Sequence, residues 1–259
     1  MQASRHFQRL LEEFKLAGTQ FEVVYGKKTL SAPFRRLLVL DSSFNPPHFG
    51  HCELIERACD RYKSEELHVL LLLSVNNADK EEKPATFDKR LYMMSILADL
   101  LSKRSIDTSV GLTTHARFIE KTGAIHKHGF HGGRITYLMG FDTLVRFLDP
   151  KYYKPSTLIE ALSDFMRQTD LFCLARKDGT GMDKQTTYGT VLANGGYEPE
   201  IPRAWASHIS IDSSPGKYYG LSSTEVRNRI QQRQPLSDLI PKEILDYIHS
   251  AGGPKIFTE

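Results

Sequence analysis

The sequence predicts an α/β fold, with a doubly wound, mostly parallel sheet followed by C-terminal helices. The first observation behind this prediction is a series of compact apolar runs of strand length, each bounded by polar or turn-forming residues. The second is that segments of helix length, with apolar residues three and four positions apart, separate these runs. Strands and helices that alternate in this way favour parallel pairing through right-handed crossovers.

The composition is that of an ordinary globular protein. Of 259 residues, 40% are hydrophobic and 25% are charged, which excludes collagen-like and disordered classes. The net charge of +3 is too small to predict a broad nucleic-acid-binding face, although it suits a phosphate-bearing ligand. Three cysteines without a C-x-x-C pair argue against a secreted disulfide framework. The longest apolar run, 69–73, is too short for a bilayer. We therefore expect a soluble cytoplasmic or nuclear protein without membrane or nucleic-acid partners, and homo-oligomer formation stays open.

The first elements follow from local patterns. Residues 7–16 look like a short amphipathic helix in a lead-in, 1–33, that precedes a single expected domain, 34–259. Residues 35–40 form a compact apolar run and predict the first buried strand. The loop after this strand leads into a helix over 48–61, whose apolar residues share one face.

The rest of the chain continues the alternation, with two interruptions. Residues 113–134 lose the pattern, and within them His126, His128 and His131 fall close together among the glycines of 129–133. This cluster favours a solvated excursion over a metal site because no nearby Cys, Asp or Glu completes a ligand shell. Residues 178–202 are rich in Gly, Thr and polar residues and predict a surface loop or small hairpin. The remaining expected strands are 67–73, 108–112, 135–139, 171–175 and 208–211, and the remaining expected helical segments are about 87–101, 141–167, 223–232 and 242–250.

The most informative stretch, S-S-F-N-P-P-H-F-G-H over 42–51, lies between the first strand and its helix. Ligands of an open parallel sheet bind outside the carboxyl ends of its strands. His48 and His51 are three positions apart at the helix start, so they share a face beside backbone N–H groups that attract anions. Gly50 would let a phosphate approach the backbone. The alternative is a Pro-Pro turn that caps a helix with surface histidines, but the setting favours imidazoles that stabilise charge on a phosphoryl group.

A second stretch, L-S-S-T-E-V-R over 221–227, opens the penultimate expected helix. Ser222 and Glu225 have the spacing of a capping box, which needs no function. The hydroxyls of Ser223 and Thr224 could equally bind ATP phosphates. Arg227, one turn further, would add a charge-assisted clamp.

The pair F-N-P-x-H-x-G-H and S-S-T-x-x-R, in this order, resembles the nucleotidyltransferase superfamily and, within it, the nicotinamide mononucleotide adenylyltransferases. Between the two motifs, G-F-D-T-L at 140–144 is similar to the G-x-D-x-L segment of that family, whose aspartate holds the adenosine ribose in relatives. The resemblance covers about residues 35–250 and implies a Rossmann-like nucleotidyltransferase fold.

The resemblance also implies a reaction. The phosphate of nicotinamide or nicotinate mononucleotide would attack the α-phosphorus of ATP, giving NAD or deamido-NAD and pyrophosphate. Mg²⁺ would be held mainly by the ATP phosphates and water, so no all-protein metal site is expected. The residues implied are His48, His51 and Arg227 for catalysis; Ser43, Phe44, Gly50, Gly140, Asp142, Ser222, Ser223 and Thr224 for ATP; and Asn45, Lys80, Arg90 and Arg176 for the acceptor.

Two departures from the family pattern concern specificity. Ser42 stands where relatives usually have glycine. The family often stacks the nicotinamide ring on a tryptophan after the third strand, but residues 112–118 contain none, and the only tryptophan is Trp205. Two alternatives therefore stay open. One is the same chemistry on another phosphate acceptor, such as phosphopantetheine; the other is an ATP-binding or ATP-hydrolysing regulatory protein with a degenerate acceptor site.

Overall fold

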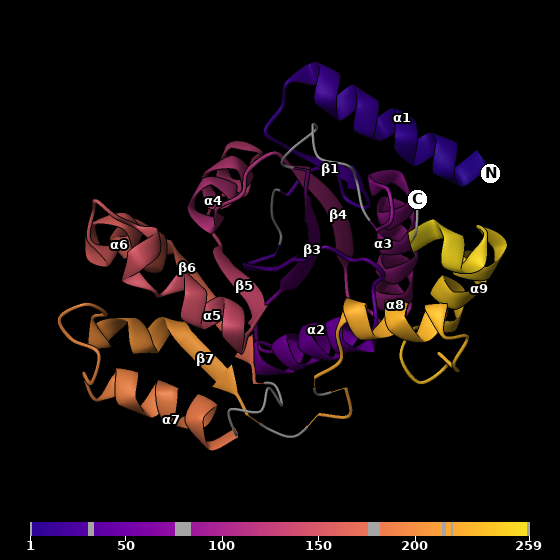
Figure 1. The fold of residues 1–259 in the computed structure, drawn as a ribbon. Coiled ribbons are helices and arrows are strands. Elements are labelled where there is room, and N and C mark those ends of the chain that lie inside the picture. Colours follow the sequence, from indigo (N-terminus) through magenta and orange to yellow (C-terminus); the bar gives the residue numbers. More distant parts are fainter. Residues whose placement is uncertain are drawn as a thin grey trace.

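Seven strands form one sheet in a computed structural model that describes residues 2–30, 34–75, 84–175, 182–213, 216–218 and 220–257 (Figure 1). Most of these strands consist of residues that are buried on both faces, as expected where helices cover a parallel sheet. The strands are β1 Phe21–Tyr25, β2 Arg36–Asp41, β3 Leu67–Ser74, β4 Thr108–Thr113, β5 Arg134–Gly140, β6 Thr169–Leu174 and β7 Ile209–Asp212.

The strand order is β1-β4-β3-β2-β5-β6-β7. All pairs are parallel except β1 with β4, where Phe21 lies opposite Thr113. The chain starts the parallel sheet at β2, builds outward to β4, and then returns to build outward from β5 on the other side of β2. The order therefore reverses between β2 and β5, and the carboxyl end of β2 lies at the crevice where such sheets bind ligands. The predicted doubly wound α/β fold is confirmed.

Helices cover both faces of the sheet (Figure 1). One apolar cluster packs residues of α1, α2, α3, α8 and α9 against one face, and a second packs residues of α4, α5, α6, the end of α7 and η2 against the other. The α-helices are α1 Gln2–Ala17, α2 Phe49–Arg61, α3 Phe87–Ser102, α4 Phe118–Lys127, α5 Phe141–Phe147, α6 Leu158–Gln168, α7 Met182–Ala193, α8 Ser223–Gln231 and α9 Lys242–Ser250. Short 3₁₀ helices are η1 Pro150–Tyr152, η2 Arg203–His208 and η3 Gly253–Phe257. No helix in the described part of the chain is long and apolar enough to cross a membrane.

Two segments expected to be loops contain helices. The excursion predicted over 113–134 contains α4, and the loop or hairpin predicted over 178–202 contains α7. In α4, Lys121 and Thr122 are buried, so polar residues occupy the face where apolar periodicity is normally sought. In α7, the fully buried Gln185 likewise places a polar residue on the buried face of the helix. The periodicity failed in both places because side-chain partners, rather than apolar character, allow these positions to be buried.

The N-terminal lead-in packs against the sheet. Its helix α1 lies across α3, and Phe14 is fully buried in the apolar cluster on that side. Its strand β1, which the sequence analysis did not identify, pairs with β4 and extends the sheet at that edge (Figure 1). Pairing of this kind joins residues about ninety positions apart, so a local pattern does not reveal it.

The buried histidine on β3 makes stability depend on pH. His68 is 1% exposed, its ring stacks on Phe34 at 4.7 Å, and its Nε2 lies 2.9 Å from the Ser109 hydroxyl. Burial and the nearby Lys27 charge lower the His68 pKa from 6.5 to about 4. The unfolded chain therefore binds the proton more tightly. The stability contributed by the neutral ring is present above pH 6.5 and is lost as the pH falls toward 4.

We expect the free energy of unfolding to fall by about 3 kcal/mol more between pH 7 and pH 4 in the natural chain than in the variant His68→Gln. Urea unfolding at several pH values measures this difference. Parallel pH profiles for the two chains would contradict it.

Candidate active site

The two sequence motifs lie side by side at the carboxyl end of β2. Residues 42–48 connect β2 to α2, and α8 begins next to them (Figure 1). Ser223 Oγ donates to the carbonyl of Pro46 at 2.9 Å, and Arg227 Nη1 donates to the carbonyl of Asn45 at 2.7 Å. These bonds span about 180 residues of sequence and fix the start of α8 against the first motif.

A cavity of about 340 Å³ opens between the two motifs. Its walls come from the loop after β2, the first turn of α2, α3 and the first turn of α8. The lining residues are Ser42, Ser43, Asn45, His48, His51, Pro84, Arg90, Ser222, Ser223, Thr224 and Arg227. Nine of these eleven were expected as site residues from the sequence.

The two histidines form a closely packed pair at the start of α2, with their ring planes tilted by 31°. His48 is the N-cap residue, with extended backbone angles, and His51 lies at the third helical position. Their ring centroids are 3.8 Å apart, and both residues are buried. The backbone N–H of His48 donates to His51 Nδ1 at 3.1 Å, which satisfies one of the amides that a helix start leaves without a helical partner.

This backbone bond selects the tautomer of His51. Because Nδ1 accepts a hydrogen bond, the proton of the neutral ring is on Nε2. His51 Nε2 lies 3.1 Å from the hydroxyl oxygen of Ser42, at the wall of the cavity. The arrangement therefore presents an N–H donor where a phosphoryl oxygen could replace the serine hydroxyl.

Gly50 has a different local role from the expected one. A Cβ added at this position would lie 3.0 Å from two atoms of the His48 ring, closer than ordinary van der Waals contact. The glycine thus makes room for the imidazole, and Gly50 is not among the residues that line the cavity. Its predicted approach to a phosphate stays a prediction.

We expect Gly50→Ala to displace the His48 ring and to lower kcat about tenfold, because small misplacements of a reacting group are costly. Alanine suits a helix better than glycine, so the thermal midpoint should stay the same or rise. Steady-state kinetics and thermal unfolding of the same preparation measure both effects. An unchanged kcat would show that the space beside His48 does not matter.

The first turn of α8 presents its polar side chains to the cavity. Ser222 is the N-cap residue, and its Oγ accepts from the backbone N–H of Glu225 at 3.2 Å, so the predicted capping contact is present. Arg227 also donates to Thr224 Oγ1 at 3.0 Å. Partial burial lowers the Arg227 pKa below its ordinary value, yet an arginine stays charged at neutral pH. One face of the cavity thus combines hydroxyl groups with a positive charge.

The opposite wall carries Arg90 of α3. Arg90 is 7% exposed, and its Nε donates to the carbonyl of Ala85 at 2.7 Å. With its amide oxygen turned toward α3, Asn45 accepts from Arg90 Nη2 at 2.9 Å. Asn45 therefore contacts Arg90 through its side chain and Arg227 through its carbonyl.

The other expected site residues lie outside this cavity or outside the described residues. Phe44 is fully buried, and its ring lies 5.1 Å from the His51 ring, so its side chain supports the histidine from the core. Gly140 is the N-cap residue of α5, and Asp142 is exposed in the first turn of that helix, at the carboxyl end of β5 beside β2. Lys80 and Arg176 lie outside the described residues.

A buried ion pair next to the site was missed. Asp41, the last residue of β2, pairs with Lys121 of α4, which is 3% exposed. Burial raises the Asp41 pKa, and the Lys121 charge opposes this rise. The pair joins α4 to the residue that precedes Ser42. The only signal in the sequence was an aspartate at the end of an apolar run, and its partner lay in a segment expected to be a loop.

The single tryptophan does not stand in for the family's stacking residue. Trp205 lies in η2 and is 8% exposed in the apolar cluster on the α4–α7 face. It is a core residue at a distance from the cavity lining.

Comparison with known proteins finds a family model and relatives that are named for nucleotidyl transfer. The family model described as cytidylyltransferase-like matches residues 39–229, a span that includes both motifs. A Schizosaccharomyces pombe protein, provisionally named nicotinamide mononucleotide adenylyltransferase, is 34% identical over 252 residues, covering 96% of each chain. A Cereibacter sphaeroides protein, provisionally named nicotinate-nucleotide adenylyltransferase, is 26% identical over 200 residues, covering 73% of this chain and 94% of that protein.

The fold is also similar to a solved structure. Plasmodium falciparum nicotinic acid mononucleotide adenylyltransferase in complex with NaAD superposes with a TM-score of 0.56, covering 86% of this chain and 98% of that chain. The two sequences are 11% identical, so this likeness concerns the fold alone.

Proposed function

This chain belongs to the cytidylyltransferase-like family, and on that basis we propose that it transfers the adenylyl group of ATP to nicotinamide or nicotinate mononucleotide. The products are NAD or its deamido form, together with pyrophosphate. The observation that carries the proposal is the convergence of the closely packed His48–His51 pair and the hydroxyl-rich start of α8 on one cavity. A relative matched over almost its whole length, and named for this reaction, supports the same conclusion.

The reaction is a direct displacement at the α-phosphorus of ATP. A phosphate oxygen of the mononucleotide forms the new bond to this phosphorus, and the bond to the bridging oxygen of the β-phosphate breaks. Pyrophosphate leaves with the electron pair. No covalent enzyme intermediate is needed, so the protein's task is to position the two substrates and to stabilise the charge that develops.

The cavity offers groups for each part of this task. The Nε2–H of His51 is placed to donate to an oxygen on the α-phosphate as negative charge builds there, with the His48 ring in contact beside it. Ser223, Thr224 and Arg227 bind the β- and γ-phosphates and so steady the leaving group. Asn45 and Arg90, on the other wall, are placed to hold the acceptor phosphate.

Magnesium fits this cavity only as a companion of ATP. The lining residues in the described structure contribute hydroxyl, amide, imidazole and guanidinium groups, with no carboxylate among them. Mg²⁺ prefers oxygen ligands and keeps much of its water, so the phosphates of ATP and water would supply most of its ligands. The ion would supply charge neutralisation on the phosphates. The side chains that line the cavity would then orient the complex of Mg²⁺ with ATP without holding the ion themselves.

The test is pyrophosphate release from ATP and Mg²⁺ with each acceptor supplied separately, with the dinucleotide identified by mass spectrometry. We expect product with nicotinamide or nicotinate mononucleotide. Product only with phosphopantetheine, or with another phosphate acceptor, would assign the same chemistry to a different substrate. Inorganic phosphate released without any acceptor-dependent pyrophosphate would overturn the proposal in favour of an ATP-hydrolysing protein.

A further inference from the structure

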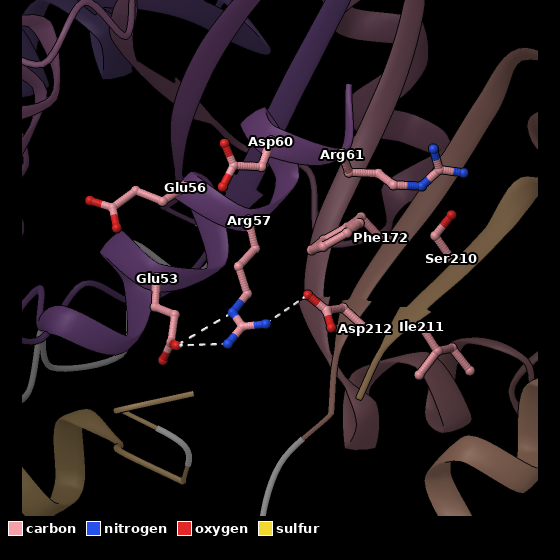
Figure 2. A pocket seen from close by; sticks show the side chains of 9 residues that line it. All are labelled: Glu53, Glu56, Arg57, Asp60, Arg61, Phe172, Ser210, Ile211 and Asp212. Carbon is pink, nitrogen blue, oxygen red and sulfur yellow. Dashed lines mark hydrogen bonds and ion pairs between the residues drawn. The ribbon is translucent and has the colours of Figure 1, made fainter. Parts of the chain in front are cut away.

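A second cavity, of about 690 Å³, lies along α2 on the side toward β6 and β7, and ion pairs connect three of its polar residues (Figure 2). Arg57 lies between Glu53 and Asp212. Its Nη1 donates to Asp212 Oδ2 at 2.9 Å, and its Nη2 lies 3.3 Å from Glu53 Oε1. Figure 2 shows both ion pairs as dashed lines that converge on the guanidinium group. All three side chains are at most 24% exposed, so these pairs are better shielded from solvent than ordinary surface pairs.

The residues in this network stand at both ends of one connection. Asp212 is the last residue of β7, where the connection to α8 begins. The other oxygen of the Glu53 carboxylate, Oε2, accepts from the backbone N–H of Tyr218 at 3.0 Å, near the end of the connection. A Cβ added at Gly216 would overlap the Glu53 carboxylate, so the chain passes close to this side chain. We call Glu53 and Arg57 the α2 clamp.

The α2 clamp is two hydrogen bonds away from the cap of α8. The carbonyl of Tyr218 accepts from the backbone N–H of Leu221 at 3.0 Å, and Leu221 directly precedes the N-cap residue Ser222. The Tyr218 ring stacks on Phe49, the first residue of α2, with centroids 4.8 Å apart. Tyr218 is thus held by α2 through both its backbone and its ring.

Helix α2 therefore positions both halves of the candidate active site. The first turn of α2 carries His48 and His51, and its next turns hold the connection that delivers Ser222, Ser223 and Thr224. We propose that Glu53 and Arg57 are positioning residues for ATP: they set the distance between the histidine pair and the start of α8 without touching the nucleotide. This inference rests on the proposed function in taking ATP as the ligand of the first cavity.

The test compares substitutions of Glu53 by direct ATP binding and by kinetics. Glu53→Ala removes the acceptor for Tyr218 and the partner of Arg57, and we expect the dissociation constant for ATP, measured by calorimetry, to rise about tenfold. The KM for the mononucleotide should stay within twofold. Glu53→Gln keeps an oxygen for the Tyr218 N–H, so its ATP affinity should lie within about threefold of the natural chain.

A matched control lies on the same helix and in the same cavity. Glu56 pairs with Arg104 in an exposed position, and no hydrogen bond or ion pair joins it to the described residues of the β7–α8 connection. Glu56→Ala should therefore leave ATP affinity and the thermal midpoint unchanged. A double-mutant cycle with Thr224 tests whether Glu53 acts through the start of α8. If Glu53 acts through the start of α8, then Glu53→Ala should weaken ATP binding less in a Thr224→Ala background than in the natural chain.

Three results would overturn the inference. The first is an ATP affinity equal to that of the natural chain in a folded Glu53→Ala variant. The second is an equal rise of the dissociation constant for ATP and the KM for the mononucleotide, together with a lowered thermal midpoint. The third is strict additivity with Thr224→Ala. If Glu53→Ala does not fold, Asp212→Asn, which keeps the shape and loses the ion pair with Arg57, is measured in the same way and should also weaken ATP binding. Because calorimetry needs no acceptor, clamp-dependent ATP binding without dinucleotide product would refute the proposed function and leave this inference standing.

Discussion

Replacing His51 with asparagine is expected to lower kcat by about 10²- to 10³-fold, the cost of removing one donor from a site that stabilises developing charge. The asparagine Oδ1 can take the place of Nδ1 as the acceptor for the His48 backbone N–H, so the start of α2 keeps its capping bond. What disappears is the N–H at the Nε2 position. We therefore expect the thermal midpoint to change little while turnover is lost, as measured by pyrophosphate release and thermal unfolding.

Two other substitutions separate catalysis from folding. His51→Gln places an amide N–H near the Nε2 position and should recover part of the activity lost in His51→Asn. His51→Ala removes both functions of the ring; we expect it to abolish turnover, with a stability cost of about 1 kcal/mol from the lost cap. Full activity in a folded His51→Asn variant would refute the role assigned to Nε2, and unfolding of that variant would show that the ring is mainly structural.

Replacing Arg227 with lysine is expected to lower kcat/KM for ATP by about 10- to 100-fold, which corresponds to the loss of one or two hydrogen bonds to a charged group. The guanidinium donates to the Asn45 carbonyl and to Thr224 Oγ1 at the same time, while still lining the cavity. A lysine ammonium is a point charge that cannot reproduce this planar fork. The same side chain anchors α8 to the first motif. We therefore expect a larger change in the KM for ATP than in the KM for the acceptor.

Arg229 provides the control on the same helix. It forms exposed pairs with Glu225 and Asp238, away from the cavity, so Arg229→Ala should leave kcat/KM within about twofold. Equal losses in Arg227→Lys and Arg229→Ala would mean that activity responds to any substitution of an arginine on α8. That result would remove the specific role of Arg227.

Sequence patterns predicted the parallel sheet well because its strands carry their own signal. Strands β2, β3, β5 and β6 contain compact apolar runs, β4 and β7 are more mixed, and each of the six was expected within about two residues of its observed position. Helices α2, α3, α8 and α9 were expected because their buried faces show helical periodicity or recognisable starts. Helices α4 and α7 were missed because buried polar residues such as Lys121 and Gln185 interrupt that periodicity. Their burial depends on partners elsewhere in the fold.

For the candidate site too, the sequence predicted which residues are present, and the structure was needed for their individual roles. Nine of the eleven residues that line the cavity were expected from the sequence: eight lie in the two motifs, and Arg90 was implied by the family resemblance. The roles of individual groups needed contacts between distant residues. Phe44 turned out to support His51 from the core, Gly50 makes space for His48, and Trp205 lies in the opposite apolar cluster.

By itself, the sequence determined the fold class, the place of the loop after the first strand of the parallel sheet, and the residue types available for phosphate chemistry. Only the tertiary structure decided that the start of α8 lies against the loop after β2, through the hydrogen bonds from Ser223 to the Pro46 carbonyl and from Arg227 to the Asn45 carbonyl. It also decided that α2 holds the connection before α8, through Glu53 and Tyr218, which are 165 positions apart. The physical reason is range: apolar periodicity and turn chemistry act between near neighbours, whereas hydrogen bonds and packing select partners only after the chain has folded.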